Sequence, residues 1–419
     1  MTNACGVDFG TSNSTLGWQR PGPTDVSPLL PLEDGKPTLP SVVFFNAEEE
    51  RASFGRAGLA EYLAGYEGRL MCSLKSLLGT PLIDGQTEVL GRALPFRGLL
   101  TQFIAELRRR GEAAAGCQFE HAVFGRPVHF IDGDAQADQL AEDTLKEIAL
   151  DVGFRDVAFQ YEPIAAAFDY ESGISREELV LVADIGGGTS DFSLVRLSPQ
   201  RAAMVDRRDD ILANGGVHIG GTDFDKYLSL ASVMPLLGLG SRLRSGSEVP
   251  SSYYFNLATW HTINFAYTQK AMLQLKDLYR DACDTVALDR LRGLIEDRAG
   301  HWLALKVEEG KIALSGNTEV ALRLERLMPP VDLALTRDGF DRAVSHLVES
   351  VEKTVGALLR DAGVAPGLVD TVFFTGGSSG VQLLRERIAA LVPQARRVEG
   401  DLFGSIGSGL ALDAARRFR

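Results

Sequence analysis

The strongest constraint on the fold of this chain is a short motif that occurs twice. An apolar segment carries an Asp near its end, turns through glycine and hydroxyl residues, and continues as a second apolar segment. The two copies cover residues 7–12 and 183–190, a little less than half the chain apart. A repeat on this scale predicts a duplicated α/β lobe whose two turns face each other.

Each turn combines groups that suit a phosphate and a metal ion. An Asp at a strand end approaches a metal ion directly or through its waters, and glycines let backbone amides close on a phosphate. Thr11, Ser12 and Thr189 add hydroxyl groups. One glycine-rich hairpin is usually only a turn, so the interpretation depends on the second copy. Together the hairpins predict a polyphosphate site in which Mg²⁺ is held mainly through water by Asp8 and Asp184.

The rest of the chain alternates predicted strands and helices, which indicates an α/β fold. The strands are expected at 4–10, 14–18, 41–45, 121–125, 157–161, 179–185, 191–197 and 370–375. Helices are expected at 55–65, 98–110, 135–151, 342–362 and 410–418, from position 162 onward, and over most of 222–312. Periodicity puts Leu140, Leu145, Ile148 and Ala149 on one buried face, and Trp260, Phe265 and Trp302 are expected to anchor the helical segment. Gly404, Gly407 and Gly409 suit close helix packing.

Composition and missing motifs exclude several classes of protein. There is no G-x-x-x-x-G-K-[ST] pattern and no G-x-G-x-x-G after the first strand, which argues against a P-loop and a Rossmann dinucleotide site. A net charge of −13 disfavours nucleic-acid binding. No apolar run approaches the roughly 18 residues that span a bilayer, so no membrane association is expected. The 4 cysteines form no C-x-x-C pair, which favours reduced thiols and a cytoplasmic protein.

Seven segments in order resemble the DnaK-type chaperones, the heat shock protein seventy family. They are residues 7–14, 73–79, 161–167, 184–191, 218–225, 308–315 and 374–378. Through residues 254–261 the chain most resembles the short YegD-like chaperones, which lack a peptide-binding domain. The resemblance implies an actin-like ATPase fold of two duplicated α/β lobes around a nucleotide cleft. Lobe I would cover 1–177 and lobe II 178–419, with a helical subdomain at about 226–304.

The resemblance also implies a role for each site residue. Lys75 would reach the γ-phosphate and orient the attacking water, and Glu162 would bind a metal-ligated water. Pro163 would transmit the nucleotide state. The metal and the attacking water would be served by Asp184 and Asp191, and the γ-phosphate by Thr189. ATP or ADP would be held by Gly10, Thr11, Ser12, Asn13, Gly186, Gly187, Gly188, Gly220, Gly221, Glu308, Lys311, Ser315, Gly376, Gly377 and Ser378.

Plainer interpretations of these residues stay open on the sequence alone. Lys75 also suits a surface lysine, Glu162 a carboxylate stabilised by a helix dipole, and the 308–315 segment a surface ion pair. Two arginines that would stack on adenine are replaced by Ile312 and Gly380, which predicts relaxed base selectivity.

Three functions follow from these features. The first is a slow Mg-dependent ATPase whose lobe closure signals to a protein partner or co-chaperone at lobe II. The second is a nucleotide-binding scaffold that does not hydrolyse ATP, and a small-molecule kinase is the third. Because the sequence stops at Arg419, no peptide-binding domain of its own is expected.

Overall fold

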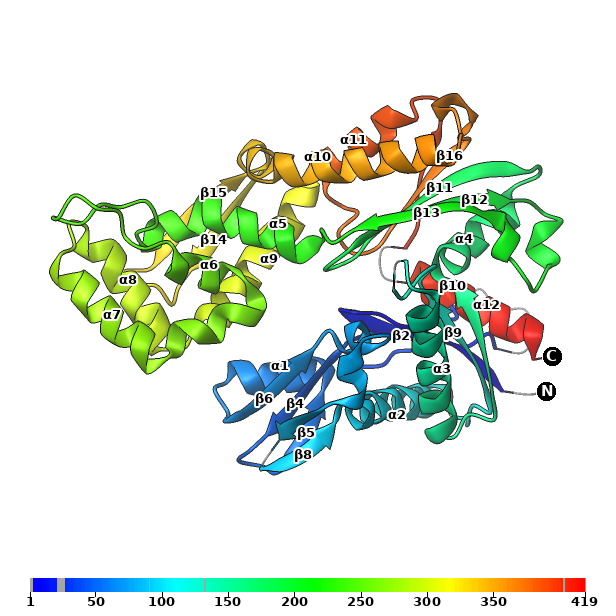
Figure 1. Cartoon of the computed structure of the whole chain (residues 1–419), viewed down its shortest axis with the longest axis horizontal. Coiled ribbons are helices and arrows are strands. Elements are labelled where there is room, and N and C mark those ends of the chain that lie inside the picture. The colour runs from blue at the N-terminus through cyan, green and yellow to red at the C-terminus, as the bar shows by residue number, and fades with distance from the viewer. Residues whose placement is uncertain (1–2, 21–26, 90, 132, 402–403, 419) are drawn as a thin grey trace. The chain divides into compact units, whose positions relative to one another are not determined.

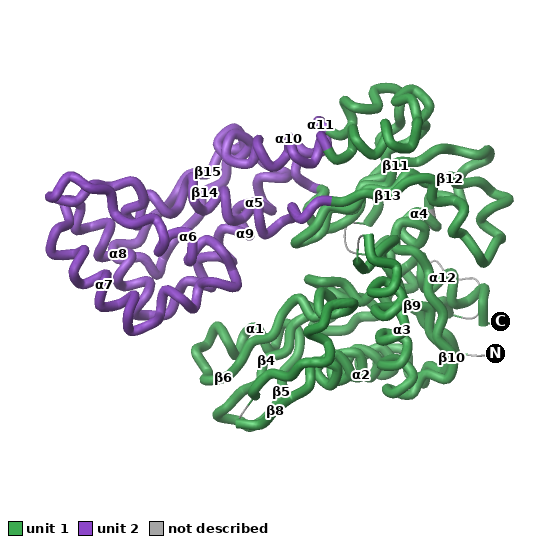
Figure 2. Tube along the Cα trace, viewed as in Figure 1, with its two compact units in different colours: residues 1–216, 354–379, 388–419 green, residues 217–353, 380–387 purple. Residues whose placement is uncertain are grey.

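The structure is a computed structural model that describes residues 3–20, 27–89, 91–131, 133–401 and 404–418. The chain forms two compact units, which Figure 2 shows in different colours. The first comprises residues 1–216, 354–379 and 388–419, and the second comprises 217–353 and 380–387. The division into lobes at residue 177 stays a prediction.

Two five-stranded sheets of the first unit repeat one arrangement (Figure 1). The first sheet has the order β10-β9-β1-β2-β3, with β1 Ala4–Phe9, β2 Asn13–Gly17, β3 Thr38–Pro40, β9 His121–Arg126 and β10 Asp156–Tyr161. The second has the order β13-β12-β11-β16-β17, with β11 Glu178–Ile185, β12 Ser190–Leu197, β13 Ile211–Val217, β16 Thr371–Thr375 and β17 Arg396–Glu399. In each sheet the first strand of an antiparallel hairpin, β1–β2 or β11–β12, pairs on its other edge with a parallel strand. That strand is β9 in the first sheet and β16 in the second. The predicted duplication of the hairpins is confirmed.

Helices pack on these sheets and enclose two apolar cores. The first core lies among β1, β9, α2 Phe96–Ala115 and α3 Ala135–Asp151, and the second among β11, α4 Glu162–Gly173 and α12 Ser405–Arg417. Further elements are α1 Gly55–Leu63 with β4 Val42–Asn46, β5 Arg51–Phe54 and β6 Gly68–Cys72, and the hairpin of β7 Gln86–Val89 and β8 Arg92–Pro95.

The last helix, α12, approaches its neighbours very closely. A Cβ atom on Gly409 would lie 1.9 Å from the carbonyl oxygen of Ala165 in α4, and one on Gly407 would lie 2.1 Å from Oγ1 of Thr15 in β2. Neither position has room for a side chain. The predicted role of these glycines in close packing is therefore confirmed, and the helix begins five residues before the predicted start at 410.

The second unit is mainly helical, as predicted for residues 222–312. It contains α5 Gly221–Leu228, α6 Ser252–Ala258, α7 Gln269–Arg280, α8 Thr285–Glu296, α9 Gly300–Gly316 and the hairpin of β14 Glu319–Leu324 and β15 Val331–Thr336. Two helices, α10 Arg337–Asp361 and α11 Gln382–Leu391, contribute residues to both units. No helix in the described part of the chain combines the length and apolarity needed to cross a membrane.

Two predicted core positions are wrong. Leu140 in α3 is 51% exposed, because Ala141, one turn before the buried Leu145, takes the inward position. Phe265 is 60% exposed. It lies in the 3₁₀ segment Trp260–Tyr267, where three residues per turn direct Ile263 and Ala266 inward instead.

Candidate functional site

The two repeated turns meet within the first unit. A Cβ atom on Gly187 would lie 2.3 Å from Oγ of Ser12. Each turn is tight, since a Cβ on Gly10 would lie 2.1 Å from the carbonyl oxygen of Asn13, and the amide of Gly186 donates to the Thr189 carbonyl at 2.8 Å. The glycine-rich corners predicted to face each other are therefore in contact.

An ion pair lies beside the first turn. Lys75 Nζ donates to Glu162 Oε1 at 2.5 Å, and the two side chains are only 12% and 14% exposed. Lys75 lies in the 3₁₀ turn Leu74–Leu77, and Glu162 is the first residue of α4. Burial by itself lowers the pKa of Lys75, but the carboxylates of Glu162, Asp8 and Asp184 outweigh that effect and raise it. Lys75 is therefore a buried cation, and the alternative of a surface lysine is wrong.

The Asp side chains of the two hairpins are weak acids. Burial, reinforced by the Glu162 carboxylate and opposed by Lys75, raises the pKa of Asp8 to about 7. Burial, reinforced by Asp191, Glu162 and Asp8, raises the pKa of Asp184 to about 8. The cluster thus contains more carboxylates than its one lysine neutralises, which is the environment that a further cation stabilises.

The second turn is supported by a neighbouring glycine segment, residues 376–378. Gly376 has a φ of +83°, and a Cβ atom at this position would lie 2.4 Å from Oδ1 of Asp184. A glycine here therefore leaves space for the Asp184 carboxylate. Two residues later the amide of Ser378 donates to the Ile185 carbonyl at 2.9 Å. The structure therefore brings the predicted residues Gly376, Gly377 and Ser378 to the Asp184 turn.

Some supporting residues were missed by the sequence reasoning. A Cβ on Gly216 would lie 2.7 Å from Oδ1 of Asp191, whose Oδ2 accepts a hydrogen bond from Thr189 Oγ1 at 2.8 Å. Ser41 Oγ donates to the Gly10 carbonyl at 2.7 Å. The paired glycines at 215–216 could have drawn attention to that strand, whereas no local pattern distinguishes Ser41.

The hairpins predict that Asp8 and Asp184 hold Mg²⁺ mainly through water, and this stays a prediction. Within the described ranges, no group of three or more His, Cys, Asp or Glu residues is placed to hold a metal ion. The excess of buried carboxylates is the observation that suits the ion. When bound, Mg²⁺ would neutralise charge on phosphate oxygens.

The remaining predicted residues lie in the second unit. Lys311 of α9 is 6% exposed, and its Nζ donates to Asp225 Oδ2 at 2.8 Å and to the Gly221 carbonyl at 3.1 Å. Gly221 begins α5, and the preceding Gly220 amide donates to Asp223 at 3.1 Å. Lys311 is thus a buried, paired cation and not part of a surface ion pair.

Besides Lys311, three further residues of α9 bear on the predicted site. Ile312 is 58% exposed, and Glu308 is also exposed. Ser315 lies beside Gly380, whose Cβ would be 3.3 Å from Ser315 Oγ, and Gln382 donates to the Ser315 carbonyl at 3.2 Å. The positions where the resemblance implies arginines therefore offer an exposed aliphatic side chain and a half-buried glycine.

Known proteins resemble this chain in sequence over most of its length. A sequence model of the family described as "Hsp70 protein" matches residues 83–232 and 293–412, well over half of the chain. The chain is 26% identical to the chaperone protein DnaK of Thermosipho melanesiensis, over 98% of this chain and 58% of that protein. It is 26% identical to the DnaK of Thermosipho africanus, over 91% and 54% respectively, and 25% identical to that of Thermotoga petrophila, over 98% and 59%. The chain thus spans little more than half the length of these curated relatives.

The matched regions include α4, both hairpin strands of the second sheet, and α9. With its mixed sheets and repeated hairpins, the chain has the predicted actin-like ATPase α/β fold. On this evidence the chain belongs to the Hsp70 family.

Proposed function

We propose that this chain binds ATP with Mg²⁺ and hydrolyses it slowly, as a chaperone-type nucleotide switch. The observation that carries the proposal is the buried Lys75–Glu162 pair beside the Asp8 and Asp184 turns. Phosphoryl transfer depends mainly on positioning and charge neutralisation. A fixed cation, excess carboxylates and two glycine turns supply groups for both.

Each residue takes one part of this work. The backbone amides of Gly10–Asn13 and Gly186–Gly188 would hold the phosphates, and Thr189 would contact the γ-phosphate. Lys75 would orient the attacking water, together with Asp191. Glu162 would hold a water of the metal, and Pro163 would pass the nucleotide state along α4. Glu308, Lys311 and Ser315, with Gly220 and Gly221, would contact the adenosine.

The switch would act through closure of the two proposed lobes, 1–177 and 178–419. A nucleotide biases such an equilibrium only when it binds one state more tightly. We propose that a protein partner or co-chaperone reads the state at lobe II, with the helical segment at about 226–304 as its contact surface. We also propose that the chain belongs to the YegD-like subgroup.

The test is single-turnover release of phosphate from ATP with Mg²⁺, comparing the wild type with Lys75→Ala. The wild type should release phosphate, and the variant should do so about tenfold more slowly or worse, equivalent to about 1.4 kcal/mol of barrier. A matched control is Lys306→Ala, because Lys306 pairs with the exposed Glu309 on the same helix α9, and its loss should not affect the rate.

Other outcomes would favour the alternatives. If the wild type binds ATP without releasing phosphate, the chain is a nucleotide-binding scaffold and the ATPase proposal is wrong. If ADP forms only when a small hydroxyl compound is added, and the phosphoryl group is found on that compound, a kinase is indicated. Because Ile312 and Gly380 stand where the resemblance implies arginines, GTP should be tested beside ATP.

A further inference from the structure

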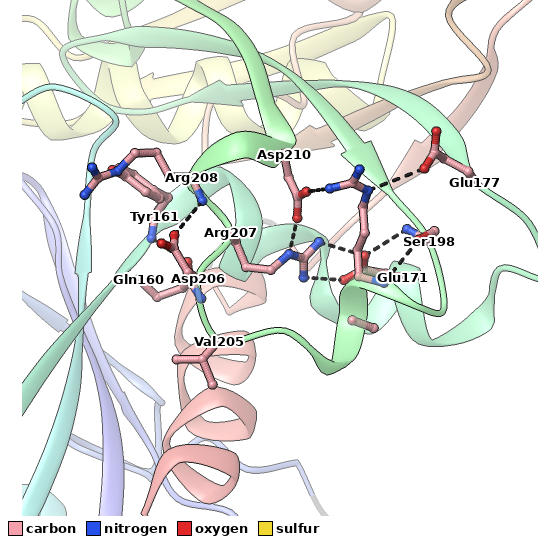
Figure 3. A network of polar contacts seen from close by, with 12 residues as sticks. Gln160, Tyr161, Glu171, Glu177, Ser198, Val205, Asp206, Arg207, Arg208 and Asp210 are labelled. Atoms are coloured by element: carbon pink, nitrogen blue, oxygen red, sulfur yellow. Dashed lines mark hydrogen bonds and ion pairs between the residues drawn. The ribbon is translucent and has the colours of Figure 1, made fainter.

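Helix α4 carries one carboxylate into the nucleotide site and another into a separate buried network. Glu162 is its first residue and Glu171 lies in its last turn. Their separation of nine positions corresponds to about 14 Å along a helix axis. Glu171 belongs to the polar network of Figure 3, which also contains Arg207 and Asp210 from the segment between β12 and β13.

The contacts of this network are unusually well shielded from water. Arg207, Glu171 and Asp210 have side chains that are 0%, 1% and 3% exposed. Arg207 Nη1 donates to Glu171 Oε2 at 2.9 Å and Nη2 donates to Oε1 at 2.8 Å. Arg207 Nε donates to Asp210, which also pairs with Arg201, and the Ser198 amide donates to Glu171 at 3.0 Å. The pair is therefore bidentate and rigid.

A buried ion pair by itself adds little to the stability of a protein. Removing two charges from water costs several kcal/mol per ion, and apolar replacements of similar volume are often as stable. A buried bidentate pair does, however, fix the relative position of the two segments that carry it. Here those segments are the end of α4 and the loop of residues 198–210.

Helix α4 has a further polar anchor in Tyr170, whose hydroxyl hydrogen-bonds to Glu178 of β11 and Thr371 of β16. Its buried middle is Ile164 to Phe168, with three consecutive alanines. Against α12, Gly409 leaves no room for a side chain beside Ala165. The Glu171–Arg207 pair adds to these contacts a fixed link between the last turn of α4 and the loop of residues 198–210.

The same loop also reaches the other end of α4. Arg208 follows Arg207 directly, and its guanidinium lies near the ring of Tyr161, the N-cap of α4 (Figure 3). Interaction with the Tyr161 hydroxyl is the largest cause that raises the pKa of Arg208. From the opposite side, the Arg126 guanidinium lies 5.3 Å from the centre of the Tyr161 ring. Two consecutive arginines of one loop therefore contact both ends of the helix.

We propose that the Glu171–Arg207 pair is a positioning device that fixes α4 along its axis and so holds Glu162 opposite Lys75. Glu171 and Arg207 touch no substrate and act only through the helix. The inference rests on the proposed function for its kinetic consequence. The geometric consequence, a loosened Lys75–Glu162 pair, can be measured without turnover.

The test replaces both members of the pair, Glu171→Leu with Arg207→Met, so that neither charge is left buried alone. Asp210 keeps Arg201 as its partner. We expect kcat for ATP to fall about tenfold while KM for Mg-ATP changes less than about twofold, because Glu162 contributes to the reacting geometry. We also expect acetylation of Lys75 by an N-hydroxysuccinimide ester, measured by mass spectrometry, to speed up at least about threefold as its pairing loosens.

Two further variants keep the test decisive. Glu112→Leu with Arg108→Met removes another shielded pair of the first unit, joined at 2.8 Å with side chains 22% and 16% exposed. That pair lies on α2, and its loss should lower stability without changing either readout. Arg207→Lys keeps the charge and loses the bidentate contact, so it should give an intermediate effect even if the double variant does not fold.

The outcomes separate the two proposals. If the wild-type protein shows no turnover, the ATPase proposal is wrong. Faster Lys75 acetylation in the variants would still support the positioning role. The positioning role is wrong if the double variant or Arg207→Lys folds and keeps both the wild-type kcat and the wild-type rate of Lys75 acetylation. An equal loss of activity in the α2 control would overturn it too, because a general loss of stability would then explain the effect.

Discussion

At the scale of single residues, the site depends on charges that do not neutralise one another. Asp8 and Asp184 end two strands in separate sheets, and Glu162 and Lys75 come from other elements. The motif reasoning identified all four residues. It could not predict that Lys75 would be buried and paired, or that Asp184 would be a weak acid, because both depend on burial and on neighbours distant in sequence.

This imbalance predicts how the stability of the ligand-free protein depends on pH. The carboxyl pKa of Asp184 rises from 3.8 to about 8 on folding, and that of Asp8 rises to about 7. At pH values between 3.8 and about 8, these carboxyl groups keep protons in the folded protein that they have released in the unfolded chain. The free energy of unfolding should therefore fall as pH rises from about 5 to about 8, by on the order of 2–4 kcal/mol.

Urea unfolding without Mg²⁺ at a series of pH values would check this prediction. Asp184→Asn cannot ionise, so the fall should be clearly smaller in that variant. Asp209→Asn is the control, because Asp209 is exposed and outside the cluster, and it should keep the wild-type dependence. Parallel curves for wild type and Asp184→Asn would show that burial does not make this carboxyl a weak acid.

At the scale of elements, regular periodicity was reliable and irregular local geometry was not. The boundaries of α3 and of the hairpin strands β11 and β12 agree with the sequence patterns within about a residue. Phe265 was misplaced because the period of its segment is three residues and not 3.6. The hairpin β14–β15 and the edge strand β13 were not predicted, and nor was the Arg207 network, whose partners lie 36 residues apart.

The close packing of α12 gives a prediction in which two effects oppose each other. Replacing a helical glycine by alanine favours the helix by about 1 kcal/mol. At Gly409, however, the new Cβ would lie 1.9 Å from a backbone carbonyl that cannot easily move. Overpacking of this kind costs about 1–3 kcal/mol or more, so Gly409→Ala should destabilise the protein by at least about 2 kcal/mol.

The matched control lies in another helix. Gly293 of α8 has open space where a Cβ would lie, so Gly293→Ala should stabilise the protein by up to about 1 kcal/mol. Chemical unfolding of both variants would measure the change in the free energy of unfolding that each substitution causes. A Gly409→Ala protein as stable as the wild type would mean that α12 shifts freely on β1 and α4.

At the scale of the whole molecule, the two hairpins unite both sheets of the first unit around one charged cluster. The repeated motif predicted a duplicated lobe whose two turns face each other. The family match covers strands of both five-stranded sheets. Ligands that act on the cluster should therefore change the stability of the complete unit, and a cation and an anion should depend on each other.

Removal of Mg²⁺ tests this mutual dependence. ATP with Mg²⁺ at 100 times its Kd should stabilise the protein by about 2.7 kcal/mol, seen as a higher unfolding temperature. ATP with EDTA should stabilise it much less, because phosphate charges would then face the carboxylates of Asp8 and Asp184 uncompensated. Asp184→Asn removes part of that repulsion, so its stabilisation by ATP in EDTA should approach its stabilisation by Mg-ATP. Equal stabilisation of the wild type with and without EDTA would contradict a metal-dependent site, and the carboxylate cluster would need another explanation.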